Sequence, residues 1–186
     1  MGPISIGDEA PNFDLTSTED ALLMLRDEII QTAIVLYFFG DPVAGNADRT
    51  GSDLEALNKN LDPLGRLRTR VLGISPAKID ELKKLQIHRK LLFPLLHDDR
   101  DFSSRYGVLP PSTPTPVEGQ APAPPATAAP ALVVVSRKQR VLWLANPVGA
   151  VADALPELLK VLKAQPSPTA SYPKKVINRL IDRWVN

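Results

Sequence analysis

The chain has 186 residues, no cysteine, and a formal net charge of +1 from 22 Lys+Arg against 21 Asp+Glu. This length suits one domain with its own core, and the missing cysteine excludes disulfides, thiolate zinc sites, iron–sulfur clusters and a cysteine nucleophile. The balanced charge argues against a generally basic nucleic-acid binder. Neither a membrane-spanning apolar run nor a basic–apolar leader is visible, so we expect a cytoplasmic protein.

The residues before position 110 alternate between strand and helix signals. The run Ala33–Phe39 is apolar and rich in aromatic and β-branched residues, which predicts a buried strand. Leucines at helical spacing over 54–64 predict a helix. The capping box Ser52-x-x-Glu55 predicts that this helix begins near Asp53.

The same alternation continues as far as position 106. Arg70–Ile74 predicts a second strand, and Ser75-Pro76 predicts an N-cap followed by proline at the first helical position. The helix that follows carries apolar residues at 79, 82 and 85 on one face. Phe93–Leu96 predicts a short strand, and 101–106 about one helical turn.

A proline-rich stretch then interrupts the pattern. Eight of the 19 prolines lie within 109–130, where aromatic residues are absent, so we expect an extended, mobile loop there. Ala131–Val135 and Val141–Leu144 predict a hairpin. Asp153 is the expected cap of the next helix, with Pro156 tolerated in its first turn. Alternating strands and helices imply a central, mainly parallel sheet covered by helices, with the hairpin as an antiparallel edge.

Several segments follow one another in a recognisable order: Gly7–Leu15 (GDEAPNFDL), Ile34–Phe39, Val71–Ser75, Phe93–Leu96, Arg105–Val108, Pro130–Val135 and Arg140–Trp143. Together they resemble peroxiredoxins of the alkyl hydroperoxide reductase/thiol-specific antioxidant (AhpC/TSA, redoxin) family. The resemblance covers roughly 4–164 and implies a thioredoxin-like α/β fold, with a central mixed sheet flanked by helices. We therefore expect one such domain over 1–165, then a linker and a C-terminal amphipathic helix over 166–186.

The motif that carries the family's chemistry is missing. Peroxiredoxins have P-x-x-x-T-x-x-C just after the first core strand, and the matching positions here are Gly40, Ala44 and Ala47. Ser52 stands where one branch has a second cysteine, and residues 128–130 (Ala-Ala-Pro) stand where the family has an arginine. An alanine methyl is no nucleophile, so the resemblance implies a fold without its peroxidatic site. Because proline, threonine and arginine are missing as well, natural loss is favoured over removal of thiols by engineering.

Three further features have a structural and a functional interpretation. Pro130 resembles the cis-proline of thioredoxin-like folds, and a trans bond is the alternative. Ser75 in Gly-Ile-Ser-Pro-Ala nearly matches a nucleophile elbow, but we interpret it as a helix cap. His97–Asp101 (HDDRD) is interpreted as an acidic turn that caps a helix rather than as a metal site. We expect neither a metal nor a cofactor.

The C-terminal segment carries the sharpest positive signal. Lys174, Lys175, Arg179 and Arg183 outnumber Asp182, so its side chains carry a net charge of +3. An isolated helix of this length is marginal in water, so its apolar side needs a partner surface, a second copy, its own domain or an anionic membrane. Six residues form one apolar stripe at helical spacing: Val176, Ile177, Leu180, Ile181, Trp184 and Val185.

These observations favour a redox-inactive, peroxiredoxin-like binding or scaffold protein without catalytic residues. One alternative is a thiol-independent enzyme, or a peroxidase by family resemblance only. The other is a peripheral membrane or complex-assembly factor that docks through the C-terminal helix. The expected partner is a protein or a second copy of the chain, with no nucleic acid.

Overall fold

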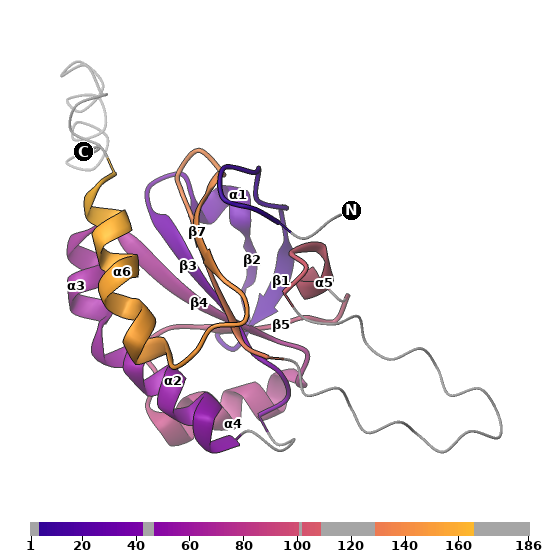
Figure 1. The fold of residues 1–186 in the computed structure, drawn as a ribbon. Coiled ribbons are helices and arrows are strands. Elements are labelled where there is room, and N and C mark those ends of the chain that lie inside the picture. Colours follow the sequence, from indigo (N-terminus) through magenta and orange to yellow (C-terminus); the bar gives the residue numbers. More distant parts are fainter. Residues whose placement is uncertain (1–3, 43–46, 101, 109–128, 166–186) are drawn as a thin grey trace, which may run out of the picture.

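The computed structural model describes residues 4–42, 47–100, 102–108 and 129–165 (Figure 1). Within them the chain forms one sheet of seven strands in the order β2-β1-β5-β4-β3-β6-β7. The strands are β1 (Asp14–Ser17), β2 (Leu22–Met24), β3 (Ala33–Phe38), β4 (Thr69–Ser75), β5 (Leu95–His97), β6 (Ala131–Val135) and β7 (Val141–Ala145). The helices are α1 (Leu25–Glu28), α2 (Ala47–Lys59), α3 (Leu61–Arg66), α4 (Ile79–Arg89), α5 (Phe102–Arg105) and α6 (Val151–Lys163).

Helices cover both faces of the sheet, so the central strands are buried on both sides. Along β3, Val35 and Tyr37 face the core under α2, α3, α4 and α6, whereas Ile34 and Leu36 face the core shared with α1 and α5. This explains why the strand is a continuous apolar run rather than an alternating one. Figure 1 shows the same two layers, with α2, α4 and α6 on one side and α1 and α5 on the other.

The expected mixed α/β sheet is confirmed, but the prediction that most of its strand pairs are parallel was wrong. β3 pairs in parallel with β4, and β4 with β5. The pairs β1–β2, β1–β5, β3–β6 and β6–β7 are antiparallel. The N-terminal hairpin β1–β2, which we had not predicted, adds the antiparallel pairs β1–β2 and β1–β5. Its strands are short and half-exposed, so they leave a weak signal in the sequence.

Three predicted helix starts were wrong for related reasons. α2 begins at Ala47 rather than near Asp53, and α4 begins at Ile79 after the N-cap Lys78 rather than after Ser75. α6 begins at Val151, so Asp153 is not its cap and Pro156 lies within the helix. For α4 and α6 the side chain of the residue before the helix accepts no hydrogen bond from the first turn, so local capping motifs misplaced the helix starts. The leucine run over 54–64 is also split, because α2 ends at Lys59 and α3 follows.

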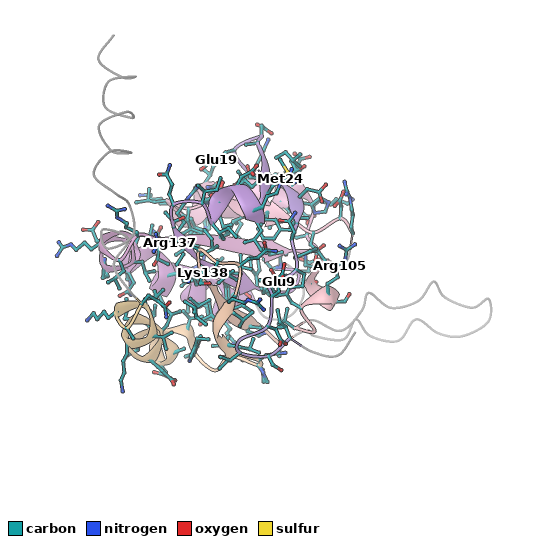
Figure 2. All side chains as sticks on the ribbon, turned by 90° about the horizontal axis from the view of Figure 1, so that it is seen from above. Glu9, Glu19, Met24, Arg105, Arg137 and Lys138 are labelled. Atoms are coloured by element: carbon teal, nitrogen blue, oxygen red, sulfur yellow. The ribbon has the colours of Figure 1, made fainter. Side chains whose placement is uncertain are left out.

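The N-terminal segment pairs with the outer edge of β7. Gly7 donates its N–H to the carbonyl of Val141 at 2.8 Å, and Val141 donates to the carbonyl of Asp8 at 2.9 Å. The backbone of Glu9 forms an isolated antiparallel β-bridge with that of Arg140. This β-bridge lies beside the β6–β7 turn, which carries Arg137 and Lys138 (Figure 2). The free edge of the sheet is therefore covered where β7 begins.

Two predicted segments lie outside the described residues. Nearly all of the proline-rich stretch lies outside them, and so does the whole apolar stripe from Val176 to Val185. The domain limits at 165 and 166 therefore stay predictions. Among the described helices, none is long and apolar enough to cross a membrane.

Candidate functional site

The candidate site lies where β3 and β4 end and α2 begins. Phe39 donates its N–H to the carbonyl of Ile74 at 3.0 Å, which continues the pairing of the two strands. Ser75, fully buried, donates its hydroxyl to the carbonyl of Gly40 at 3.1 Å and accepts the N–H of Ala77 at 3.2 Å. Ser75 is thus the last residue of β4 and joins two strand ends, rather than capping a helix or presenting a nucleophile.

The positions that match the peroxiredoxin motif are only partly brought together. Gly40 follows β3, Ala47 is the first residue of α2, and Ala44 lies outside the described residues. Ser52 is in the middle of α2, exposed, and its hydroxyl donates to the carbonyl of Asp48 at 3.0 Å. The capping box at Ser52 was therefore wrong, because a serine inside a helix turns its hydroxyl back onto the preceding turn.

A buried carboxylate, which sequence reasoning missed, belongs to the next residue along α2. Asp53 is 3% exposed, and its Oδ2 accepts the hydroxyl of Tyr37 at 3.0 Å. Its Oδ1 accepts the N–H of Val151, the first residue of α6, at 2.9 Å. A buried carboxylate needs such donors, and the amino end of a helix supplies both an unpaired N–H and a favourable dipole. Asp53 therefore caps α6 from another helix.

Arg49 extends this arrangement to the loop before α6. Its Nη2 donates to the carbonyls of Val148 and Gly149 at 2.7 and 2.8 Å, and its Nε lies 3.8 Å from Asp53 Oδ2. We call Tyr37, Arg49, Asp53 and the backbone of 148–151 the Asp53 network. It joins β3, α2 and α6 at the edge where the peroxidatic site is expected.

Pro130 joins the Asp53 network through the backbone. Its carbonyl accepts the N–H of Val148 at 2.8 Å, next to the carbonyl that Arg49 binds. Among the described residues the cis X-Pro bond is Asn146–Pro147, so the predicted cis bond at Pro130 was wrong. Trans is the default for X-Pro bonds, and the Ala-Pro sequence alone did not justify an exception.

The electrostatics of the network suit structure rather than acid–base chemistry. Burial, together with the negative charge and hydrogen bond of Asp53, raises the pKa of the Tyr37 hydroxyl well above its usual range. Tyr37 therefore stays neutral and serves as a donor at physiological pH. The hydrogen bonds from Tyr37 and Val151 and the nearby guanidinium of Arg49 occupy the Asp53 carboxylate, which leaves it poorly placed to accept a substrate proton.

The acidic turn after β5 was correctly interpreted as a helix cap. Asp98 is buried, and its two carboxylate oxygens accept the N–H groups of Phe102 and Ser103 at 2.6 and 2.8 Å. His97 Nδ1 has no hydrogen-bond partner among the described residues, and His88 is exposed. No group of three or more potential metal ligands occurs among the described residues.

A family model described as "AhpC/TSA family" matches residues 6–144 of the chain. The chain belongs to the AhpC/TSA family. Among curated relatives of this AhpC/TSA chain, the putative peroxiredoxin Bcp of Haemophilus influenzae is 29% identical over 109 residues, which cover 58% of this chain and 68% of the relative. Peroxiredoxin Bcp of Escherichia coli K12 is 32% identical over 111 residues, covering 58% and 67%.

Solved structures confirm the thioredoxin-like peroxiredoxin fold of this AhpC/TSA chain. BcpB of Mycobacterium tuberculosis superposes with a TM-score of 0.72 at 17% identity, covering 87% of this chain and 98% of that one. A mutant of PrxQ from Xylella fastidiosa superposes with a TM-score of 0.71 at 20% identity, covering 88% and 98%. The fold is therefore that of the family, although the chain has no cysteine anywhere in its sequence.

The AhpC/TSA chain thus has a hydrogen-bonded network beside the position where its resemblance to peroxiredoxins implies a thiol. The sequence did contain a signal for this network. Arg49 and Asp53 are four residues apart, and Asp53 directly precedes Leu54 on the buried side of α2. A charged residue among buried helix positions predicts a specific partner.

Proposed function

We propose that this protein is a redox-inactive member of the AhpC/TSA family that acts as a binding or scaffold module in the cytoplasm. The absence of cysteine from the whole chain, with alanine at the motif position Ala47, is the observation that supports redox inactivity. Peroxide reduction by a peroxiredoxin requires a thiolate nucleophile, and neither serine nor alanine supplies one at neutral pH. Support also comes from the Asp53 network, whose polar atoms are engaged in holding helices together.

The binding half of the proposal depends on the stripe of Val176, Ile177, Leu180, Ile181, Trp184 and Val185. A helix with one apolar side, four basic residues and a tryptophan suits docking into a groove of a partner protein. Trp184 is the expected anchor, because large aromatic residues dominate the energetics of such interfaces. The partner would be a protein with an apolar groove bordered by acidic residues.

Quantitative affinity purification from the native source tests this proposal. The intact chain and the Trp184→Ala variant serve as baits, and a partner found with the first is titrated with both purified proteins. We expect Trp184→Ala to weaken binding by about 30-fold or more, corresponding to roughly 2 kcal/mol, with an almost unchanged unfolding midpoint. A fall of about 3 kcal/mol in unfolding free energy, with no partner lost, would instead make Trp184 a core residue. Fractionation of native cells tests the cytoplasmic location.

A further inference from the structure

A shallow groove runs between α2 and α6 on the outer side of the helix layer. Its volume is about 630 Å³. The two helices pack against each other (Figure 1). Residues from both helices line it: Ser52, Glu55, Ala56, Lys59, Asn60, Ala152, Leu155, Pro156 and Leu159.

The shape of the groove suits a helix with an apolar side. Small residues, Ala56 on α2 and Ala152 on α6, leave room for another backbone to approach, and Leu159 supplies a half-exposed apolar surface. The α6 side of the lining extends from Ala152 to Leu159, about 10 Å along the helix axis. That length matches about two turns of a third helix.

The polar chemistry of the groove is rich in acceptors. Pro156 has no N–H, so it donates no helical hydrogen bond to the carbonyl of Ala152 in the same groove. The amide of Asn60 donates to the carbonyl of Ala56 at 2.8 Å, which leaves its oxygen to accept. Glu55 adds a partly exposed carboxylate, whose Oε1 already accepts from Arg89 at 2.7 Å and whose other oxygen accepts no hydrogen bond from the described residues. Lys59 is the cation among the lining residues.

We infer that residues 176–185 of the same chain dock into the α2–α6 groove. The stripe supplies apolar side chains, and Arg179, Arg183 and the indole of Trp184 supply donors for an acceptor-rich groove. The chain between α6 and the stripe is long enough for the stripe to reach the groove. α6 ends at Lys163, and the residues 164–175 can span up to about 40 Å, several times the length of the groove.

Docking of the chain's own segment would have a regulatory consequence, which rests on the proposed function. A stripe seated in the groove is covered, so a partner that binds the stripe must compete with the groove. The apparent affinity for that partner is then reduced by the fraction of molecules in which the stripe is free. The groove would therefore set the threshold for partner binding.

Disulfide trapping in the full chain tests the docking, because the chain has no other cysteine. The test protein carries Ala152→Cys with Leu180→Cys, and the matched control carries Leu22→Cys with Leu180→Cys. Ala152 and Leu22 are both exposed, but Leu22 lies on β2 at the edge of the sheet opposite β7. A disulfide needs Cα atoms within about 7 Å, so it reports close approach.

We expect an intrachain disulfide to form at least ten-fold faster in the test pair than in the control pair. Adding Ala56→Arg, which fills the groove and repels the basic segment, is expected to return the rate to that of the control. Equal rates in both pairs, or mainly interchain dimers on a non-reducing gel, would overturn the inference. If the disulfide forms but affinity purification finds no partner, docking stands and the proposed function is contradicted. If a partner binds but the disulfide does not form, the proposed function stands and docking is contradicted.

Discussion

The Asp53 network and the α2–α6 groove involve the same two helices but differ in how their polar groups are satisfied. In the network the Asp53 carboxylate is buried, and Tyr37 and Val151 donate to it. In the groove Ser52, the residue just before Asp53, is exposed, and the oxygen of Asn60 is free to accept. A satisfied, buried network holds elements together, whereas an exposed groove with open acceptors can receive a ligand. The Asp53 network thus has a structural role, whereas the groove is the surface that we propose for docking.

The largest expected effect separates the two regions most clearly. Asp53→Ala leaves the hydroxyl of Tyr37 and the N–H of Val151 buried without an acceptor, so we expect a loss of about 3 kcal/mol in unfolding free energy. Asp53→Asn is the matched control, because it keeps an acceptor oxygen and should lose less than half as much. Urea unfolding measures both. A loss below 1 kcal/mol for Asp53→Ala would show that the network does not hold α2 and α6 together.

Alkaline pH tests the buried tyrosines. The pKa of Tyr37 and the pKa of Tyr106 are both raised far above the usual 10.0, mainly by burial. Above pH 10 the unfolded chain loses these protons while the folded chain keeps them, so stability is complete below pH 10 and falls as the pH rises further. We expect a fall of about 1.4 kcal/mol per pH unit for each tyrosine. Tyr37→Phe should remove one tyrosine's share, and an unchanged slope in urea unfolding would contradict this assignment.

Ser52→Ala is the smallest expected effect and the companion to Asp53→Ala. The Ser52 side chain is exposed and bonds only within its own helix turn, so its removal should change unfolding free energy by less than about 0.5 kcal/mol. Alanine is also the better helix former, which favours a change toward stability. The measurement is again urea unfolding. A loss of several kcal/mol would mean that the groove side of α2 is as tightly integrated as the network.

The strongly patterned part of the fold could be predicted from the sequence. The runs that became β3 and β6 are apolar over their full lengths, and β4 is apolar in its middle, because both faces of the sheet are covered. Such runs are readable without a structure. The turn at Asp98 was also readable, because its carboxylate bonds to N–H groups four and five residues away. Local chemistry leaves a local pattern in the sequence.

The sequence marks Asp53 as a charged residue on the buried side of a helix, but its partners in the candidate site could not be predicted, for the opposite reason. The partners of Asp53 lie 16 residues before it and 98 residues after it, and no spacing rule connects them. Likewise, α6 takes its cap from α2, so the nearby Asp153 was wrongly predicted as the cap. Long-range polar contacts become visible only when the sheet has placed the helices.

Central to the proposed function is that the chain keeps the peroxiredoxin fold without its redox chemistry. The most direct measurement is the consumption of hydrogen peroxide by the purified protein with a thiol reductant, beside buffer and denatured-protein controls. We predict no turnover above those controls, because the sequence has no cysteine and Ala47 stands at the motif position. Reproducible turnover above both controls that copurifies with the folded protein would contradict the claim.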